Sequence, residues 1–148
     1  AKGLCFALDI PLITIPTLKI LAAPYNKNGK VVALLDARRD EVYTAVYDKG
    51  GALKTKTHAH ILTSNSFADL AAEQIYFVGT GAKKTKQILP LNLNWEFILN
   101  HPSALAMPAL ASEAFEKKQF ANIHNFTPTY LKPVRITKSK KDALGRPF

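Results

Sequence analysis

The order of the apolar runs after residue 30 is the feature that most constrains the fold of this chain. Residues 31–36 and 41–48 are rich in β-branched and apolar side chains and are joined by a short polar link, which predicts two strands. The turn sequence Asp48-Lys49-Gly50-Gly51 then leads into a third predicted strand, residues 53–62. Three consecutive strands with short links predict an antiparallel meander.

Helices and strands alternate after the third strand. Residues 66–73 predict a short amphipathic helix, and residues 74–78 form a strand that is mostly apolar on both faces. A strand of that kind is typical of a parallel sheet that is covered on both sides. The turn at residues 79–82 then opens a predicted helix that runs to about residue 89.

The last elements complete a recognisable order. Residues 95–99 predict another apolar strand, and Ser103 is a candidate cap for a longer helix that ends near residue 119. Pro108 is expected to bend this helix unless it falls in the first turn. The resulting order, βββαβαβα, is typical of one lobe of the α/β fold shared by actin-like ATPases and ribonuclease H-like proteins.

The residues before position 30 predict only a helix end, a buried strand over residues 11–15, and a short helix over residues 18–23 that Thr17 caps. These elements correspond to the closing part of a second, similar lobe. The predicted division of the chain is a remnant of an N-terminal actin-like lobe (1–28), a C-terminal actin-like lobe (29–131) and a basic tail (132–148).

The formal net charge is +9, and the tail contributes much of it. Basic residues of the tail are Lys132, Arg135, Lys138, Lys140, Lys141 and Arg146, against a single acid, Asp142, so the tail carries +5. A solvated tail is the favoured interpretation, and direct contact with RNA is the alternative. No aromatic residue is interleaved with these charges apart from Phe148, so the sequence gives little support for base stacking.

The chain shows no apolar run long enough to span a membrane, and its single cysteine, Cys5, rules out an internal disulfide. One cysteine fits a reducing compartment, and a cytoplasmic location is expected. His58 and His60 share one face of a predicted strand, a spacing that can hold zinc, but no cysteine or carboxylate lies near them in sequence. They are interpreted as surface histidines, and no catalytic residue, metal ligand or cofactor is predicted.

Two turns are candidates for phosphate contact. Gly79-Thr80-Gly81-Ala82 follows a buried strand and opens a helix, so its backbone amides are placed as in some phosphate-binding turns. It matches neither the G-x-x-x-x-G-K-[ST] nor the full G-x-G-x-x-G pattern, so a structural turn is the favoured interpretation.

The hairpin at residues 36–41 is the second candidate. In active actin-like ATPases this hairpin wraps phosphate with an acidic residue followed by small residues, because the backbone must approach the phosphate closely. Here Asp36 is present, but Arg38 and Arg39 occupy the link. Asp36, Gly79 and Gly81 are therefore interpreted as positions of a degenerate nucleotide loop. The two arginines either attract an anion or are plain solvent-exposed hairpin residues.

Four segments, in order and at matching spacing, resemble motifs of the TsaB (YeaZ) family. They are Ala1-Lys2-Gly3-Leu4 with the run that follows to Leu18, Leu35-Asp36-Ala37-Arg38-Arg39-Asp40-Glu41-Val42-Tyr43, Val78-Gly79-Thr80-Gly81-Ala82, and Pro128-Thr129-Tyr130-Leu131-Lys132. Each motif alone is weakly specific, but together they cover most of the chain. The family's opening D-T-S strand and G-P-G-S-F-T-G-L-R-I-G segment have no counterpart, so the chain is expected to be the C-terminal two-thirds of such a protein.

The resemblance implies a two-lobed, actin-like protein without a catalytic site. Members of the family pair with the related TsaD, a small ATPase called TsaE joins them, and the complex makes threonylcarbamoyladenosine in tRNAs that read ANN codons. A non-catalytic partner or scaffold role is therefore expected, with tRNA met indirectly or through the basic tail. Candidate contacts to a partner or an anion are Lys2, Arg38, Arg39 and Arg135, and a homodimer remains open.

Two other functions compete with this one. A metallopeptidase-like activity, assumed in older descriptions of the family, requires a metal site and a general base, and the sequence shows neither. A small basic RNA-binding module is supported by charge alone.

Overall fold

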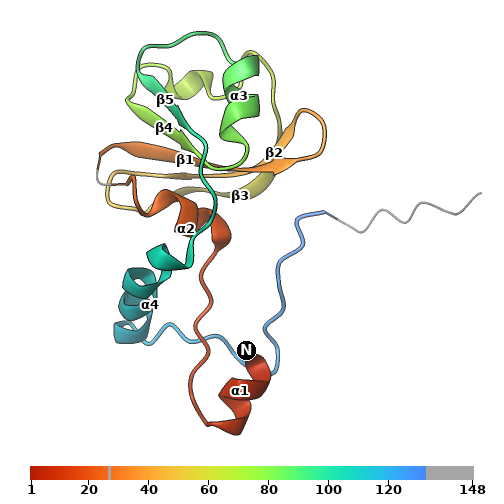
Figure 1. The fold of residues 1–148 in the computed structure, drawn as a ribbon, viewed down its shortest axis with the longest axis vertical. Coiled ribbons are helices and arrows are strands. Elements are labelled where there is room, and N and C mark those ends of the chain that lie inside the picture. Colours follow the sequence, from red (N-terminus) through yellow and green to blue (C-terminus); the bar gives the residue numbers. More distant parts are fainter. Residues whose placement is uncertain (27, 133–148) are drawn as a thin grey trace, which may run out of the picture.

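A five-stranded mixed sheet forms the centre of the computed structural model, which describes residues 1–26 and 28–132 (Figure 1). The strand order is β3-β2-β1-β4-β5, with β1 antiparallel to β2, β2 antiparallel to β3, and β4 and β5 parallel to their inner neighbours. This confirms the predicted meander followed by parallel strands. The strands are β1 (Lys30–Ala37), β2 (Glu41–Tyr47), β3 (Leu53–Ile61), β4 (Ile75–Val78) and β5 (Trp95–Ile98).

The central strand β1 is buried on both faces. Val31, Val32, Ala33 and Leu34 are all fully inaccessible to solvent, as expected of a strand with neighbours on both edges and helices on both sides. Alternate residues point in opposite directions, so Val32 and Leu34 belong to one core cluster and Val31 and Ala33 to the other. The continuous apolar run in the sequence thus supplies two cores at once.

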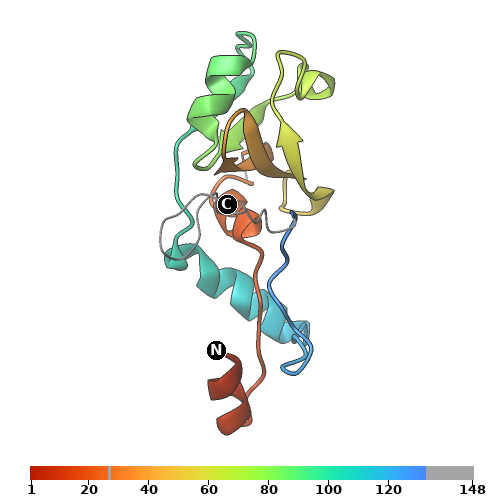
Figure 2. The same cartoon turned by 90° about the vertical axis from the view of Figure 1, so that its right-hand side faces the viewer.

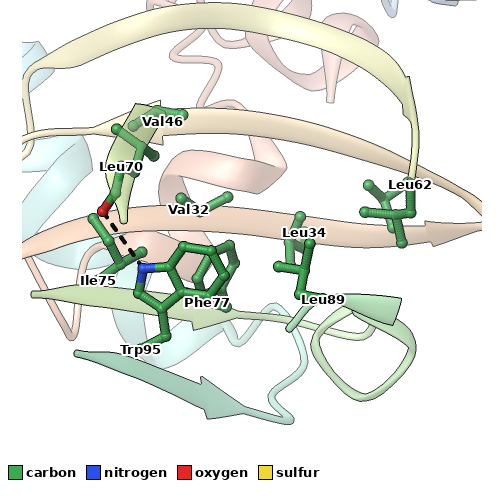
Figure 3. Close-up of a cluster of buried hydrophobic side chains, with 10 residues drawn as sticks. Val32, Leu34, Val46, Leu62, Leu70, Ile75, Phe77, Leu89 and Trp95 are labelled. Atoms are coloured by element: carbon green, nitrogen blue, oxygen red, sulfur yellow. Dashed lines mark hydrogen bonds between the residues drawn. The ribbon is translucent and has the colours of Figure 1, made fainter. Parts of the chain in front are cut away.

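One face of the sheet packs against α3 (Ala82–Ile88) and the 3-10 turn η1 (Ala68–Leu70). Phe77 lies in this core beside Trp95 (Figure 3). The Phe77 ring stacks on Phe97 with centroids 4.8 Å apart and makes a T-shaped contact with Trp95 at 5.3 Å. The indole Nε1 of Trp95 donates a long hydrogen bond to the carbonyl oxygen of Leu70 at 3.5 Å, so the buried N–H keeps a partner.

The helix expected over residues 66–73 is reduced to the single turn η1. Phe67, the residue before η1, has a left-handed backbone with φ of 62°, which ends any continuous right-handed helix at that point. The hydroxyl of Ser66 instead accepts the backbone N–H of Thr63 at 2.9 Å and holds a local turn. The predicted length was therefore wrong, although the order βββαβαβα holds with this turn in the place of its first helix.

The opposite face is covered by α2 (Thr17–Ala22), whose Leu18, Leu21 and Ala22 pack against the second core cluster. The helix begins at Thr17 itself, and Pro16 takes the capping position without a side-chain hydrogen bond, so the expected Thr17 cap was wrong. Although α2 belongs to the segment 1–28 in the predicted division, it packs on the sheet of the following segment. The division itself stays a proposal.

The remaining helices extend away from the sheet as an arm (Figures 1 and 2). They are α1 (Lys2–Ala7), η2 (Ala104–Ala106) and α4 (Met107–Glu116). Pro108 lies in the first turn of α4 and does not bend it, and Ser103 accepts the amide of Leu105 and so caps η2 rather than α4. No residue of α4 is buried, and α1 buries only Cys5.

The strand expected over residues 11–15 does not form. The only sheet-like pairing of this segment within residues 1–26 and 28–132 is one isolated bridge between Leu12 and Ala121. Apolar and β-branched composition favours a strand only where a neighbouring strand supplies hydrogen bonds, and one bridging residue does not suffice. None of the helices in the described part of the chain is long and apolar enough to cross a membrane.

Candidate functional site

The hairpin between β1 and β2 is the first of the predicted site regions. Ala37 pairs with Glu41, which leaves Arg38, Arg39 and Asp40 as a three-residue link. Arg39, in the middle of the link, adopts a left-handed backbone with φ of 65°. All three link residues are exposed, so both arginine side chains lie at the tip of the hairpin.

The inner side of this hairpin is filled by the ammonium group of Lys84 from α3. Its Nζ atom donates to the carbonyl oxygens of Ala37 at 2.6 Å and Glu41 at 3.1 Å, and also to the carbonyl oxygen of Arg39. A fourth contact is an ion pair with the carboxylate of Asp36. The inner side of the hairpin is therefore occupied by a cation of the protein itself.

Both carboxylates at the ends of the hairpin strands are paired with lysines. Asp36 pairs with Lys84, and Glu41 pairs with Lys132 at the end of the described chain. The backbone N–H of Asp36 donates to the hydroxyl of Thr80 at 2.9 Å, which joins the hairpin to the turn before α3. Because Asp36 and Glu41 are both paired with lysines, the charges that the exposed link presents to solvent are those of Arg38, Arg39 and Asp40, a formal sum of +1.

The glycines of the second predicted site are explained by packing. Gly79 has φ of +123°, and a Cβ atom there would lie 2.1 Å from the carbonyl oxygen of Leu34. The amide of Gly79 donates to Ile98 at 3.0 Å, and that of Gly81 donates to Leu34 at 3.2 Å. These two amides are engaged inside the protein, which supports the structural interpretation of the turn.

Of the other two predicted contact residues, Lys2 lies apart from this site. The ammonium group of Lys2 donates to the carbonyl oxygens of His124 at 3.3 Å and Phe126 at 3.1 Å, so it ties α1 to a later segment. Arg135 lies outside the described residues. The structure therefore brings together Asp36, Gly79 and Gly81 around the hairpin and leaves Lys2 apart from them.

His58 and His60 lie side by side on β3, with ring centroids 5.8 Å apart. His60 Nε2 is 2.9 Å from the Ser66 hydroxyl, and partial burial, with a smaller contribution from the nearby His58, lowers the pKa of His60 below its ordinary value. Among residues 1–26 and 28–132 there is no group of three or more His, Cys, Asp or Glu side chains that could hold a metal ion.

A groove of about 650 Å³ lies beside α2, on the same face of the sheet that α2 partly covers. Its floor is formed by Leu35, Tyr43 and Thr57 of the first three strands, and its walls by the segments around residues 14–18 and 126–132. Lys132 is the one charged residue among its described lining residues. The sequence patterns did not indicate this groove, because its walls come from opposite ends of the chain.

Lys84 was also missed by the sequence analysis. It lies more than 40 positions from its hairpin partners, and no motif spacing links them. The available signal was indirect: a lysine in the first turn of a helix that follows the glycine turn, next to the buried Thr85.

A comparison with protein families supplies the wider context for this lobe. The family described as "TsaD: tRNA N6-adenosine threonylcarbamoyltransferase" matches residues 1–141. The chain belongs to this family. The match covers nearly all of the sequence, including the hairpin and the glycine turn.

Individual relatives point to the TsaB branch. The chain is 28% identical over 139 residues to the Bacillus subtilis tRNA threonylcarbamoyladenosine biosynthesis protein TsaB, which covers 89% of this chain and 60% of that protein. Two solved structures from Pseudomonas aeruginosa, one titled YeaZ and the other titled by its similarity to peptidase YeaZ, match at 27% identity with TM-scores of 0.65 and 0.68, respectively. Each match covers 88% of this chain and 63% of the solved chain.

These findings confirm the expected resemblance to the TsaB (YeaZ) family and the actin-like fold of the lobe. The chain spans about three-fifths of the length of the relatives it matches.

Proposed function

We propose that this chain takes part in the synthesis of threonylcarbamoyladenosine in tRNA as a non-catalytic partner of a TsaD-like protein. The similarity to TsaB supports the process. The observation that carries the non-catalytic role is the Lys84 ammonium inside the hairpin. In an active actin-like ATPase that hairpin wraps a phosphate, whereas here a lysine ammonium contacts its carbonyl oxygens.

The contacts of the hairpin support a binding role for its outer side. Arg38 and Arg39 are exposed, and guanidinium groups bind carboxylates and phosphates in a two-pronged geometry. We therefore assign these arginines to contact with an acidic partner surface. The proposal extends to a cytoplasmic location, to a TsaE-like ATPase in the same complex, and to tRNA met through the partner or the basic tail. Lys2 and Arg135 remain proposed contacts, and a homodimer remains an alternative to the TsaD-like pairing.

The first test is the modification itself. Depleting the protein that contains this chain in its own cells is expected to reduce threonylcarbamoyladenosine in tRNA hydrolysates, measured by mass spectrometry. Restoring the wild-type gene should restore the nucleoside. Unchanged threonylcarbamoyladenosine levels after depletion would contradict the proposed function.

The second test concerns the hairpin. The double variant Arg38→Ala, Arg39→Ala should weaken copurification with the TsaD-like protein of the same genome, while Lys49→Ala, at an exposed turn, should not. Purified protein is expected to hydrolyse no ATP. Turnover that disappears in Asp36→Ala would contradict the non-catalytic role, and metal-dependent peptide cleavage would favour the peptidase alternative. Salt-sensitive binding of free tRNA without any partner would favour the RNA-binding module.

A further inference from the structure

The oxygens around Lys84 are arranged as a cage for a cation. Three backbone carbonyls, from Ala37, Arg39 and Glu41, converge on the Nζ atom together with the Asp36 carboxylate. The left-handed conformation of Arg39 curls the link so that alternate carbonyls face the same point. An ammonium group has three N–H donors, and the four oxygens around Nζ provide an acceptor for each of them.

Two backbone amides next to the cage, those of Asp36 and Gly81, already donate to other protein groups. A phosphate cradle is lined by free backbone N–H groups. Here the amide of Asp36 donates to Thr80, and the nearby amide of Gly81 donates to Leu34. The carbonyl oxygens of Ala37, Arg39 and Glu41 point to the Lys84 ammonium, and the side chains of Arg38 and Arg39 are exposed to solvent.

The single negative charge among the oxygens around Lys84 favours a monovalent cation. One carboxylate, that of Asp36, and three neutral carbonyls contact the ammonium and balance its single positive charge. Of the other two nearby acids, Glu41 is paired with Lys132 and Asp40 is exposed at the link. Carbonyl oxygens replace the hydration shell of potassium in ion-selective pores, whereas divalent ions are usually bound by several carboxylates or retained waters. The Lys84 side chain is only 21% exposed, so this charge is partly removed from water.

We propose that the β1–β2 hairpin is a monovalent-cation site whose resident ion is the tethered Lys84 ammonium, and that Lys84 thereby fixes this hairpin as a cation-binding rather than a phosphate-binding element. The inference goes beyond the proposed role in tRNA modification and does not depend on it. A variant without the ammonium group should accept potassium, ammonium or methylammonium in its place.

The test uses Lys84→Met, which keeps the apolar stem and removes the charge. Its thermal midpoint is compared in potassium chloride and choline chloride at equal ionic strength, since choline is too large for the cage. Lys84→Met should be less stable than wild type in choline chloride and should recover part of the difference, saturably, as potassium or methylammonium is added. Wild type and Lys83→Ala, an exposed neighbour on the same helix, should show no such cation dependence.

A second measurement tests whether the added cation binds at the β1–β2 hairpin. Amide hydrogen exchange of the peptide that contains residues 36–41 should slow in Lys84→Met when potassium replaces choline, while the β3 peptide should not change. Stabilisation of Lys84→Met by inorganic phosphate instead of by cations would overturn the proposal. So would equal stability in all salts, and so would a variant that stays unfolded in potassium as well as in choline.

Discussion

The carbonyl oxygen of Leu34 occupies the space that a side chain at Gly79 would need. A Cβ atom on Gly79 would lie 2.1 Å from that oxygen, and Gly79 also holds φ of +123°, a conformation that L side chains rarely adopt. Leu34 belongs to the central strand and Gly79 directly follows β4, so this contact sets how closely the glycine turn approaches β1.

Gly79→Ala is therefore expected to lower the free energy of unfolding by about 3 kcal/mol, because both backbone strain and a clash with buried backbone are introduced. Urea denaturation followed by circular dichroism measures the change. Gly3→Ala is the matched control, since no atom lies within 4 Å of a Cβ at Gly3 and alanine favours the helix α1. Equal stability of Gly79→Ala and Gly3→Ala would contradict this prediction, because it would mean that the turn at Gly79 accommodates a side chain without cost.

The hydroxyl of Thr44 is buried in the sheet and has no hydrogen-bond partner among the described residues. Thr44→Val replaces this hydroxyl by a methyl group of similar size and should raise the free energy of unfolding by about 1 kcal/mol. The comparison is Thr85→Val, which removes a buried hydroxyl that donates to Gly81 at 2.9 Å. That variant should lose stability by about 1 kcal/mol, and a loss of stability in Thr44→Val would indicate that its hydroxyl has a partner after all.

The lowered pKa of His60 predicts a specific dependence of stability on pH. The folded protein favours the neutral ring, so the unfolded chain binds the proton first as the pH falls below about 6.5. The free energy of unfolding should therefore decrease on acidification from neutral pH and level off once the folded-state pKa is passed. His60→Gln should flatten this slope, whereas His101→Gln, at an exposed position, should keep it. An identical slope in His60→Gln would assign the effect to another group.

The basic tail offers a prediction about binding rather than folding. Removing residues 137–148 should leave the thermal midpoint unchanged, because this stretch has few apolar residues to bury. It should weaken tRNA or complex binding more at low salt than at high salt, since phosphate contacts release counterions. Lys138→Gln, Lys140→Gln and Lys141→Gln in the full chain should reproduce the binding loss if charge is responsible. A large drop in the midpoint would show that the tail packs against the lobe.

The sequence predicted well those features that depend on neighbours in the chain. The β1–β2 hairpin, the turn at residues 48–51 and the buried strand β4 follow from periodicity and turn residues. Features that depend on residues far apart in the sequence were missed or predicted wrongly. The segment 11–15 has the composition of a strand but finds only Ala121 to pair with, and the Lys84 cage joins a helix to a hairpin that no local pattern connects. Phe67 shows a third cause, because a single left-handed residue shortened a helix that the apolar spacing favoured.

The two outer strands of the sheet bear on how copies of this chain behave when crowded together. An exposed strand edge is a template on which another chain can add a strand and begin a fibre. The outer strand β3 carries Lys54 and Lys56, and the opposite outer strand, β5, is only four residues long and includes Glu96. Growth of the sheet from β3 would require two ammonium groups to lose water, and growth from β5 would gain few hydrogen bonds. The lobe thus resists the most common route to amyloid-like aggregation at both ends of its sheet.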